Sequence, residues 1–262
     1  MTMRGTACLS LFVLSLVAGF AEDVRQTNTF RVMTYNIHHG QGTDGKVDLD
    51  RIAALIKAEK ADIVALQEVD RGTLRTTRRD FPAELAKLTA MNVYFDKNID
   101  YQGGEYGNII LSRFPVLEKT NTHYQMLSQH ELRGLLQVVL DVNGRKLFFM
   151  STHLDYHNDD AERALDVKTI KAALDSNTNM AAILCGDFNE GPGSRTYHRL
   201  SELLTDAWKT VGKGSGFSFS SSGPWERIDY IWHSKGVTPV KAWITRTSAS
   251  DHLPVLAEFS LE

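Results

Sequence analysis

Carboxylate, amide and imidazole side chains recur at one kind of place in this sequence, directly after or within short apolar runs. The members of this set are Asn36, Glu68, His153, Asp187, Asn189, Asp229, Asp251 and His252. Carboxylate and amide oxygens are ligands that Mg²⁺ accepts readily, and imidazoles donate or accept protons near neutral pH. Together these residue types indicate metal-assisted attack of water on a phosphate ester, a reaction that needs charge neutralisation and an activated nucleophile.

Each of these residues alone could equally be a helix cap or a turn residue. Several carboxylates in one buried place, however, are unfavourable unless a cation or a proton neutralises them. If the segments did not meet, each buried polar group would need a separate partner. The set therefore favours one shared site with a hard divalent cation. Because the chain has only two cysteines, a zinc site built from several thiolates is not supported.

Apolar periodicity predicts the elements that must position these groups. Strands are predicted at 30–35, 63–66, 93–95, 108–111, 135–140, 147–150, 181–185, 228–232, 239–244 and 255–259. Helices are predicted at 49–59, 81–89, 159–175 and 194–204. Asn143 and Gly144 predict a tight hairpin turn between two of the strands.

Each half of the chain interleaves strands with two helices. This order predicts an α/β fold in which two mixed sheets pack face to face and helices cover both outer faces. The resulting four-layer α/β/β/α sandwich is expected to form one domain, residues 22–262. Because neighbouring strand ends share a sheet edge, the polar groups are expected to converge in one cleft.

An ordered series of short motifs accompanies this pattern. The motifs are Thr34-Tyr35-Asn36, Gln67-Glu68-Val69, Leu111-Ser112-Arg113-Phe114-Pro115, Thr152-His153-Leu154, Gly186-Asp187-Phe188-Asn189, Ile228-Asp229-Tyr230-Ile231 and Ser250-Asp251-His252. The series resembles the endonuclease/exonuclease/phosphatase (DNase I-like) superfamily, which includes nucleases, abasic-site endonucleases, neutral sphingomyelinases, inositol polyphosphate phosphatases and tyrosyl-DNA phosphodiesterases. The resemblance covers about residues 30 to 259 and implies the same four-layer sandwich.

The chemistry of Mg²⁺ makes Glu68 the first choice for its direct ligand, with Asn36 and Asp251 as neighbours that bind directly or through water. Mn²⁺ stays open as a substitute. The resemblance implies that Asp187 orients or deprotonates the attacking water and that Asn189 fixes its geometry.

The resemblance also implies that His252 faces the phosphate while Asp229 holds its tautomer. His153 is expected to donate to a phosphoryl oxygen or to the leaving group. A structural hydrogen bond at a strand end is the alternative explanation for His153. His38 and His39 follow Asn36 closely, but a polar loop explains them equally well.

Candidate substrate-binding residues follow Glu68 and precede the predicted strand 108–111. An arginine-rich run could hold phosphate at the rim of the cleft, or could be a solvated face. The glycine-rich stretch 101–107, which contains Tyr106, could be a specificity lid or a mobile turn. The substrate-binding set is Arg71, Arg78, Arg79 and Tyr106. Phe217, Phe219 and Trp225 could stack on a base or a head group, or pack in the core. Arg113 and Arg133 could hold structural carboxylates.

The N-terminus predicts export. Arg4 precedes the apolar stretch 7–20, and Gly19 and Ala21 have the spacing that a signal peptidase prefers. Residues 1–21 are therefore expected to be a signal peptide, although a buried N-terminal helix is the alternative. The apolar stretch is short for a bilayer span, so no stable membrane anchor is expected. The mature chain would keep only Cys185, which predicts a buried, inert thiol and no intrachain disulfide.

Composition and net charge limit the classes of function that the chain can have. With 42% hydrophobic and 23% charged residues, the chain has an ordinary globular composition, and its net charge of −3 argues against binding duplex DNA over its whole surface. We therefore expect a secreted or periplasmic hydrolase of a small or lipid-derived phosphate ester. A secreted nuclease that acts on DNA or RNA is the alternative, and a non-catalytic binding module is the third. The sequence does not determine the oligomeric state.

Overall fold

The computed structural model describes residues 1–2 and 29–261. The predicted signal peptide, residues 1–21, lies almost wholly outside the described residues and stays a prediction. Among the described helices, none is long and apolar enough to cross a bilayer.

The first sheet has six strands in the order β11-β12-β1-β2-β4-β3. Its strands are β1 (Thr29–Asn36), β2 (Ile63–Arg71), β3 (Asn92–Tyr101), β4 (Gly104–Ser112), β11 (Val237–Ile244) and β12 (Val255–Leu261). β1 and β2 are parallel, and the other neighbours are antiparallel. The sheet is therefore mixed, as the sequence predicted. The parallel pair brings the carboxyl ends of β1 and β2 to one edge.

The second sheet has six strands in the order β5-β6-β7-β8-β10-β9. Its strands are β5 (Val116–His123), β6 (Gly134–Val142), β7 (Arg145–His153), β8 (Ala181–Asp187), β9 (Thr205–Asp206) and β10 (Asp229–His233). β7 and β8 are parallel and β10 is antiparallel to β8, so His153 and Asp229 both lie opposite Asp187 in the register.

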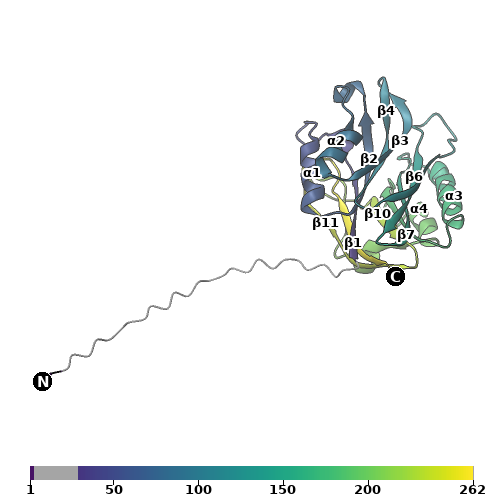
Figure 1. Ribbon diagram of the computed structural model, residues 1–262. Helices are drawn as coiled ribbons and strands as arrows, with labels where there is room; N and C mark the ends of the chain where they lie inside the picture. The colour runs from purple at the N-terminus through teal and green to yellow at the C-terminus, as the bar shows by residue number, and fades with distance from the viewer. Residues whose placement is uncertain (3–28, 262) are drawn as a thin grey trace.

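Helices cover the outer face of each sheet, which completes the four layers (Figure 1). α1 (Leu49–Ala58) and α2 (Phe81–Thr89) lie on the first sheet, and α3 (Ala161–Asp175) and α4 (Arg195–Ser201) lie on the second. The shorter elements are η1 (His38–Gly40), η2 (Leu74–Thr76) and α5 (Ala207–Val211). The predicted α/β/β/α sandwich is confirmed.

Alternating side chains of buried strands explain this layering. In β1, Phe30 and Val32 enter the core between the sheets, whereas Met33 and Tyr35 pack under α1 and α2. Successive side chains of a strand point to opposite faces, so a strand buried on both faces reads as a continuous apolar run. Cys185 lies fully buried in the core between the sheets, as the sequence predicted, and burial raises the pKa of its thiol.

Several features differ from the sequence-based predictions, and the short elements β9 and α5 were not predicted. β5 was not predicted, because it is an edge strand whose residues are largely polar and exposed, so it carries little apolar signal. The stretch 101–107 is not a loop. Tyr101 pairs with Gly104, and the chain reverses at Gln102 and Gly103, whose φ values are +46° and +72°. Positive φ at both turn positions matches the twist of a two-residue hairpin.

Candidate active site

Asn36, at the end of β1, connects the two sheets at their common edge. Its Nδ2 donates hydrogen bonds to Oε1 of Glu68 at 2.9 Å and to Oδ2 of Asp187 at 3.0 Å. Its Oδ1 accepts from the backbone N–H of His38 at 3.0 Å. Because carboxylates can only accept, this network determines the orientation of the amide. Asn36 would have to rotate its amide to offer Oδ1 to a metal.

A β-bulge in β2 sets the position of Glu68. Leu66 pairs with Ile109 and Val69 with Gly107, so the two residues between them face only Asn108 on β4. Glu68 has a φ of +60°, a conformation that is unfavourable for a residue with a side chain, by roughly 1 kcal/mol or more. Bulges of this kind redirect a side chain, and here the bulge holds the Glu68 carboxylate beside Asn36.

Asp187 ends β8 and is buried. Its Oδ1 accepts the backbone N–H of Asn189 at 2.9 Å, and Asn189 has a φ of +53°. The Asn189 side chain donates to the backbone carbonyl of Leu154 at 2.9 Å. Asn189 therefore holds the turn that orients Asp187. Burial and the neighbouring Asp229 carboxylate raise the pKa of Asp187.

Two histidines approach the same oxygen of Asp187. Nε2 of His153 and Nε2 of His252 each lie 3.6 Å from Oδ2 of Asp187. The opposite nitrogen of His252, Nδ1, lies 2.9 Å from Oδ2 of Asp229. Although burial opposes the charged ring, the Asp229 and Asp187 carboxylates raise the pKa of His252 to about 10. His252 is therefore a cationic donor.

Arg133 defines the state of His153. Its Nη1 lies 2.8 Å from Nδ1 of His153 and 2.9 Å from Oε1 of Glu131. A guanidinium has no acceptor, so Nδ1 of His153 must accept and the neutral ring carries its proton on Nε2. Burial, Arg133 and His252 lower the pKa of His153. Sequence analysis did not connect these residues. The available signal was one arginine directly before the apolar run of β6.

Asp251 lies at the more open side of the site. Oγ of Ser250 lies 2.8 Å from the carbonyl oxygen of Asn36 and 3.1 Å from Oδ1 of Asp251. Nδ1 of His38 lies 3.9 Å from the same Asp251 oxygen. The Asp251 side chain is 40% exposed, so it can reach a ligand that enters from solvent.

The donor set fits a hard divalent cation. Ligand atoms of Asp187, Asp229 and His252 all lie within 4.8 Å of one another. Oδ1 of Asp229 is buried and, among the described residues, has no hydrogen-bond partner. Glu68 lies beside Asn36, and Asp251 directly precedes His252, so four carboxylates from separate segments belong to this site. Such an oxygen-rich group requires positive charge, and Mg²⁺ accepts it.

The arginines after Glu68 mostly contact protein groups. Arg71 pairs with Glu105 and stacks on Phe95 at 4.3 Å. Arg79 pairs with Glu84 at 2.5 Å. These contacts support the solvated-face explanation for Arg71 and Arg79.

Arg78 and Arg75 complete this arginine run. Nη1 of Arg78 donates to the carbonyl oxygens of Gly72 at 3.1 Å and Gly103 at 2.6 Å. Arg75 forms two hydrogen bonds with Asp70, at 2.7 and 2.8 Å. A substrate role for the arginines stays a prediction.

Tyr106 is the one buried member of the predicted substrate-binding set. It belongs to β4, is buried, and lies under the guanidinium of Arg75 at 5.3 Å from its ring centroid. Burial and the Glu68 carboxylate raise the pKa of its hydroxyl. Tyr106 is therefore a neutral hydroxyl beside the predicted metal ligand.

An aromatic pair flanks His252. The Phe219 ring lies 4.9 Å from the His252 ring, and Trp225 lies 6.2 Å from Phe219. Trp225 is 61% exposed, so it does not belong to the core, and Phe217 is also exposed. A ring with a free face at this place can stack on part of a substrate.

Comparison with known proteins shows which family and which solved structures the chain is similar to. A model of the endonuclease/exonuclease/phosphatase family matches residues 33–252. The chain is 25% identical to YbhP, an uncharacterised protein of Escherichia coli K12, over 91% of this chain and 99% of YbhP. A solved endonuclease/exonuclease/phosphatase structure from Beutenbergia cavernae is 26% identical, with a TM-score of 0.76 over 89% of this chain and 72% of that one. A mannosyl-6-phosphatase of Bacteroides thetaiotaomicron is 18% identical, with a TM-score of 0.75 over 88% of this chain and 100% of that one.

Proposed function

The chain belongs to the endonuclease/exonuclease/phosphatase family, whose enzymes hydrolyse phosphoester bonds, and we propose that it cleaves a small or lipid-derived phosphate ester with Mg²⁺. One observation carries this proposal. Asp187 accepts a hydrogen bond from Asn36 and lies between two histidines, one neutral and one cationic. This geometry offers a base for water and two donors for phosphoryl oxygens in one place.

Glu68 and Asp251, with Asn36 after rotation of its amide, would hold the cation. Bound Mg²⁺ would supply positive charge to the phosphoryl oxygens and help to orient the ester. Mn²⁺ has the same preference for oxygen ligands and is a candidate substitute.

Each side chain of the site then has its own role in the reaction. Asp187 orients the attacking water and takes its proton as the new P–O bond forms. His252, held by Asp229, donates to a phosphoryl oxygen through Nε2. His153 donates its Nε2 proton to a second phosphoryl oxygen or to the leaving oxygen as the old P–O bond breaks. Asn189 keeps Asp187 in place through its backbone N–H.

Three observations support a small or lipid-derived ester. The net charge is −3, the nearby arginines are engaged with protein groups, and an aromatic pair, half-buried Phe219 and exposed Trp225, flanks His252. The similarity to a mannosyl-6-phosphatase supports a phosphomonoester of a small molecule as one member of this class. Trp225 would also stack on a nucleobase, which favours a secreted nuclease as the second candidate.

A substrate panel tests this proposal. The chain without residues 1–21 is incubated with Mg²⁺ and plasmid DNA, single-stranded DNA, RNA, small phosphodiesters, lipid-derived phosphodiesters and sugar monophosphates. We expect small or lipid-derived esters to give the highest kcat/KM. Rapid, sequence-tolerant nicking of the plasmid would contradict the preferred substrate class and support the nuclease.

We also propose that the protein is exported to the periplasm or the medium. Arg4, the apolar stretch 7–20 and Ala21 support this. N-terminal sequencing of protein recovered from the exported fraction should begin after Ala21. Recovery of the full chain from the cytoplasm alone would contradict export.

A further inference from the structure

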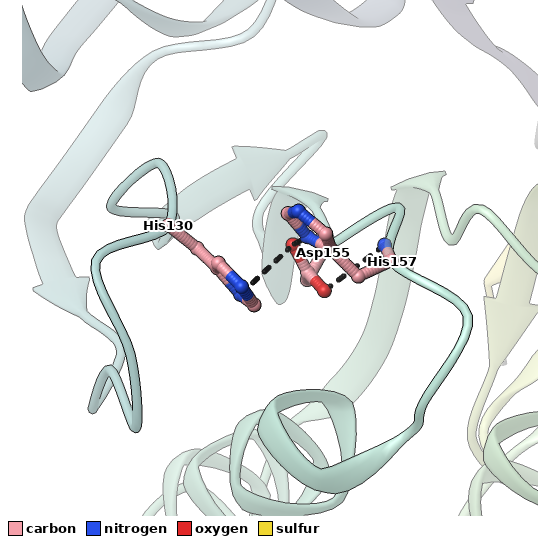
Figure 2. A group of neighbouring side chains, drawn as sticks. All are labelled: His130, Asp155 and His157. Carbon is pink, nitrogen blue, oxygen red and sulfur yellow. Dashed lines mark hydrogen bonds and ion pairs between the residues drawn. The ribbon is translucent and has the colours of Figure 1, made fainter.

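A second group of potential metal ligands lies outside the active site. His130 belongs to the segment between β5 and β6, and Asp155 and His157 belong to the segment between β7 and α3. Figure 2 shows the side chains of His130, Asp155 and His157 close together, with dashed lines from Asp155 to each histidine. One ligand atom from each residue lies within 4.8 Å of the other two.

The two rings lie against each other beside the same carboxylate. They stack with their centroids 3.6 Å apart and their planes 11° apart. Nδ1 of His157 lies 2.7 Å from Oδ1 of Asp155, and Nδ1 of His130 lies 3.9 Å from that same oxygen. Nδ1 of His130 is buried, and within the part of the chain that the structure describes no contact to it has the geometry of a hydrogen bond, although Oε1 of Glu162 lies 3.3 Å away. A buried nitrogen held by such contacts alone is poorly satisfied, and a bound ligand would satisfy it better.

Negative charge accumulates around this group. Glu162, in the first turn of α3, has Oε1 3.3 Å from Nδ1 of His130. Asp166 follows one turn later, and its buried Oδ1 has no partner among residues 29–261. Burial and the Glu162 and Asp155 carboxylates raise the pKa of Asp166 to about 8. Arg163 is shared, because it lies 3.9 Å from Asp155 and 3.0 Å from Glu190. Asp166 therefore adds no charge at neutral pH, but the Asp155 and Glu162 carboxylates, with one shared arginine beside them, leave negative charge that a cation would balance.

We propose that His130, Asp155 and His157 bind a divalent transition-metal ion of the zinc class, with Glu162 beside it. Two imidazoles and one carboxylate are a donor set that suits Zn²⁺, whereas Mg²⁺ and Ca²⁺ prefer oxygen alone. Each ring must turn about its Cβ–Cγ bond, because a metal lies in the plane of the imidazole that binds it. The side chains of His130 and His157 are 24% and 33% exposed, and turning either ring would separate the stack that the two rings form.

The ion would connect two segments that frame the active site. Oε1 of Glu162 already accepts the backbone N–H groups of Leu127 and Ser128, at 3.0 and 3.1 Å. The same segment continues through His130 to Arg133, which holds His153. Metal binding therefore fixes the segment that carries this positioning residue, at a site separate from the Glu68 centre.

Zinc binding by purified variants tests the proposal. Metal-free protein competes with a chromophoric chelator for Zn²⁺ in four forms. These are wild type, His130→Asn/His157→Asn, Asp187→Asn/His252→Asn, and the control His198→Asn, whose exposed histidine on α4 belongs to neither group. We expect the active-site variant and the control to retain one tightly bound equivalent that the His130/His157 variant loses. Equal zinc binding by the His130/His157 variant and wild type would overturn the proposal.

Zinc-edge absorption of the loaded Asp187→Asn/His252→Asn protein gives a readout that does not depend on the folding of the His130/His157 variant. Two imidazoles and oxygen ligands without sulfur are expected. Fewer than two imidazoles, or no zinc retained by that protein, would contradict the site. Circular dichroism of each metal-free variant, with His157→Asn as the milder substitution, separates loss of the ligand from loss of the fold.

Discussion

Nη1 of Arg133 lies 2.8 Å from Nδ1 of His153, and this contact determines which nitrogen of that histidine faces the site as a donor. The proton on Nε2 points to Asp187, 3.6 Å away. On the other side of Asp187, His252 is held by Asp229 at 2.9 Å and is cationic. The same carboxylate oxygen is thus flanked by a neutral and a charged imidazole, because one has an arginine behind it and the other an aspartate.

Replacing Arg133 should impair turnover more than binding. Without the guanidinium, His153 can take either tautomer, so a fraction of the molecules lacks the Nε2 proton. Arg133→Gln is expected to lower kcat by about 10-fold or more with a smaller change in KM, since a positioned acid–base group contributes about 10² or more. Steady-state kinetics over pH 5 to 9 measures both constants.

Arg113→Gln is the matched control, because Arg113 is half exposed and lies 3.9 Å from Asp62. An unchanged kcat in Arg133→Gln, at a retained melting temperature, would rule out this positioning role.

Substitution of a predicted metal ligand and substitution of an acid–base residue should have different kinetic effects. Glu68→Ala is expected to shift the Mg²⁺ concentration needed for half-maximal activity upward, because a predicted ligand is lost. His252→Ala and Asp187→Asn should instead lower kcat by about 10² or more at saturating Mg²⁺. Activity is measured as a function of Mg²⁺ and, separately, Mn²⁺. If Glu68→Ala and chelation both left hydrolysis unchanged, the metal-assisted mechanism would be wrong.

Trp225 should affect substrates according to their leaving group. It is exposed and close to Phe219, which contacts the His252 ring, so it can stack on a planar or apolar group. Trp225→Ala is expected to raise KM several-fold for aryl or nucleoside esters, which is about 1 kcal/mol of stacking, and to leave small alkyl esters unchanged. Leu117→Ala removes another exposed apolar side chain, on β5, and serves as control. Equal effects on both ester types would contradict a stacking role.

Asp166 should make the stability of the fold depend on pH. Its pKa is raised from 3.8 to about 8 by burial and by neighbouring carboxylates. The Asp166 carboxyl of the folded chain therefore loses its proton at a higher pH than that of the unfolded chain. Between about pH 4 and 8 the unfolded state therefore binds fewer protons, and the free energy of unfolding falls as pH rises. The substitution Asp166→Asn has no titrating carboxyl at this position, so it removes this fall in the free energy of unfolding.

We expect Asp166→Asn to be stabilised relative to wild type by up to about 5 kcal/mol more at pH 8 than at pH 4, because the pKa rises from 3.8 to about 8 and one unit of pKa shift corresponds to about 1.4 kcal/mol. Urea unfolding with a chelator present, at both pH values, measures this difference. Lys171→Gln, on the exposed face of α3, is the control. Parallel pH profiles for wild type and Asp166→Asn would show that Asp166 does not titrate as described.

Much of the fold could be predicted because a buried strand or helix shows a characteristic pattern of apolar residues in its own sequence. β2, β7 and β8 lie between two apolar layers, so their residues read as short continuous apolar runs, and α1 and α2 show a helical stripe. The polar residues that end these strands were visible for the same reason, since they interrupt apolar runs. β5 has no such apolar run, because it lies at a sheet edge and is largely exposed to solvent.

What local sequence determined was therefore which residues are buried, where the buried strands lie and which polar groups end them. The tertiary structure decided their partners. Arg133 meets His153 only because β6 pairs with β7, and His130 meets Asp155 and His157 only because their segments adjoin across that pair. Periodicity records the burial of each residue along the chain, whereas a contact between distant segments depends on strand register and sheet packing, which no single segment encodes.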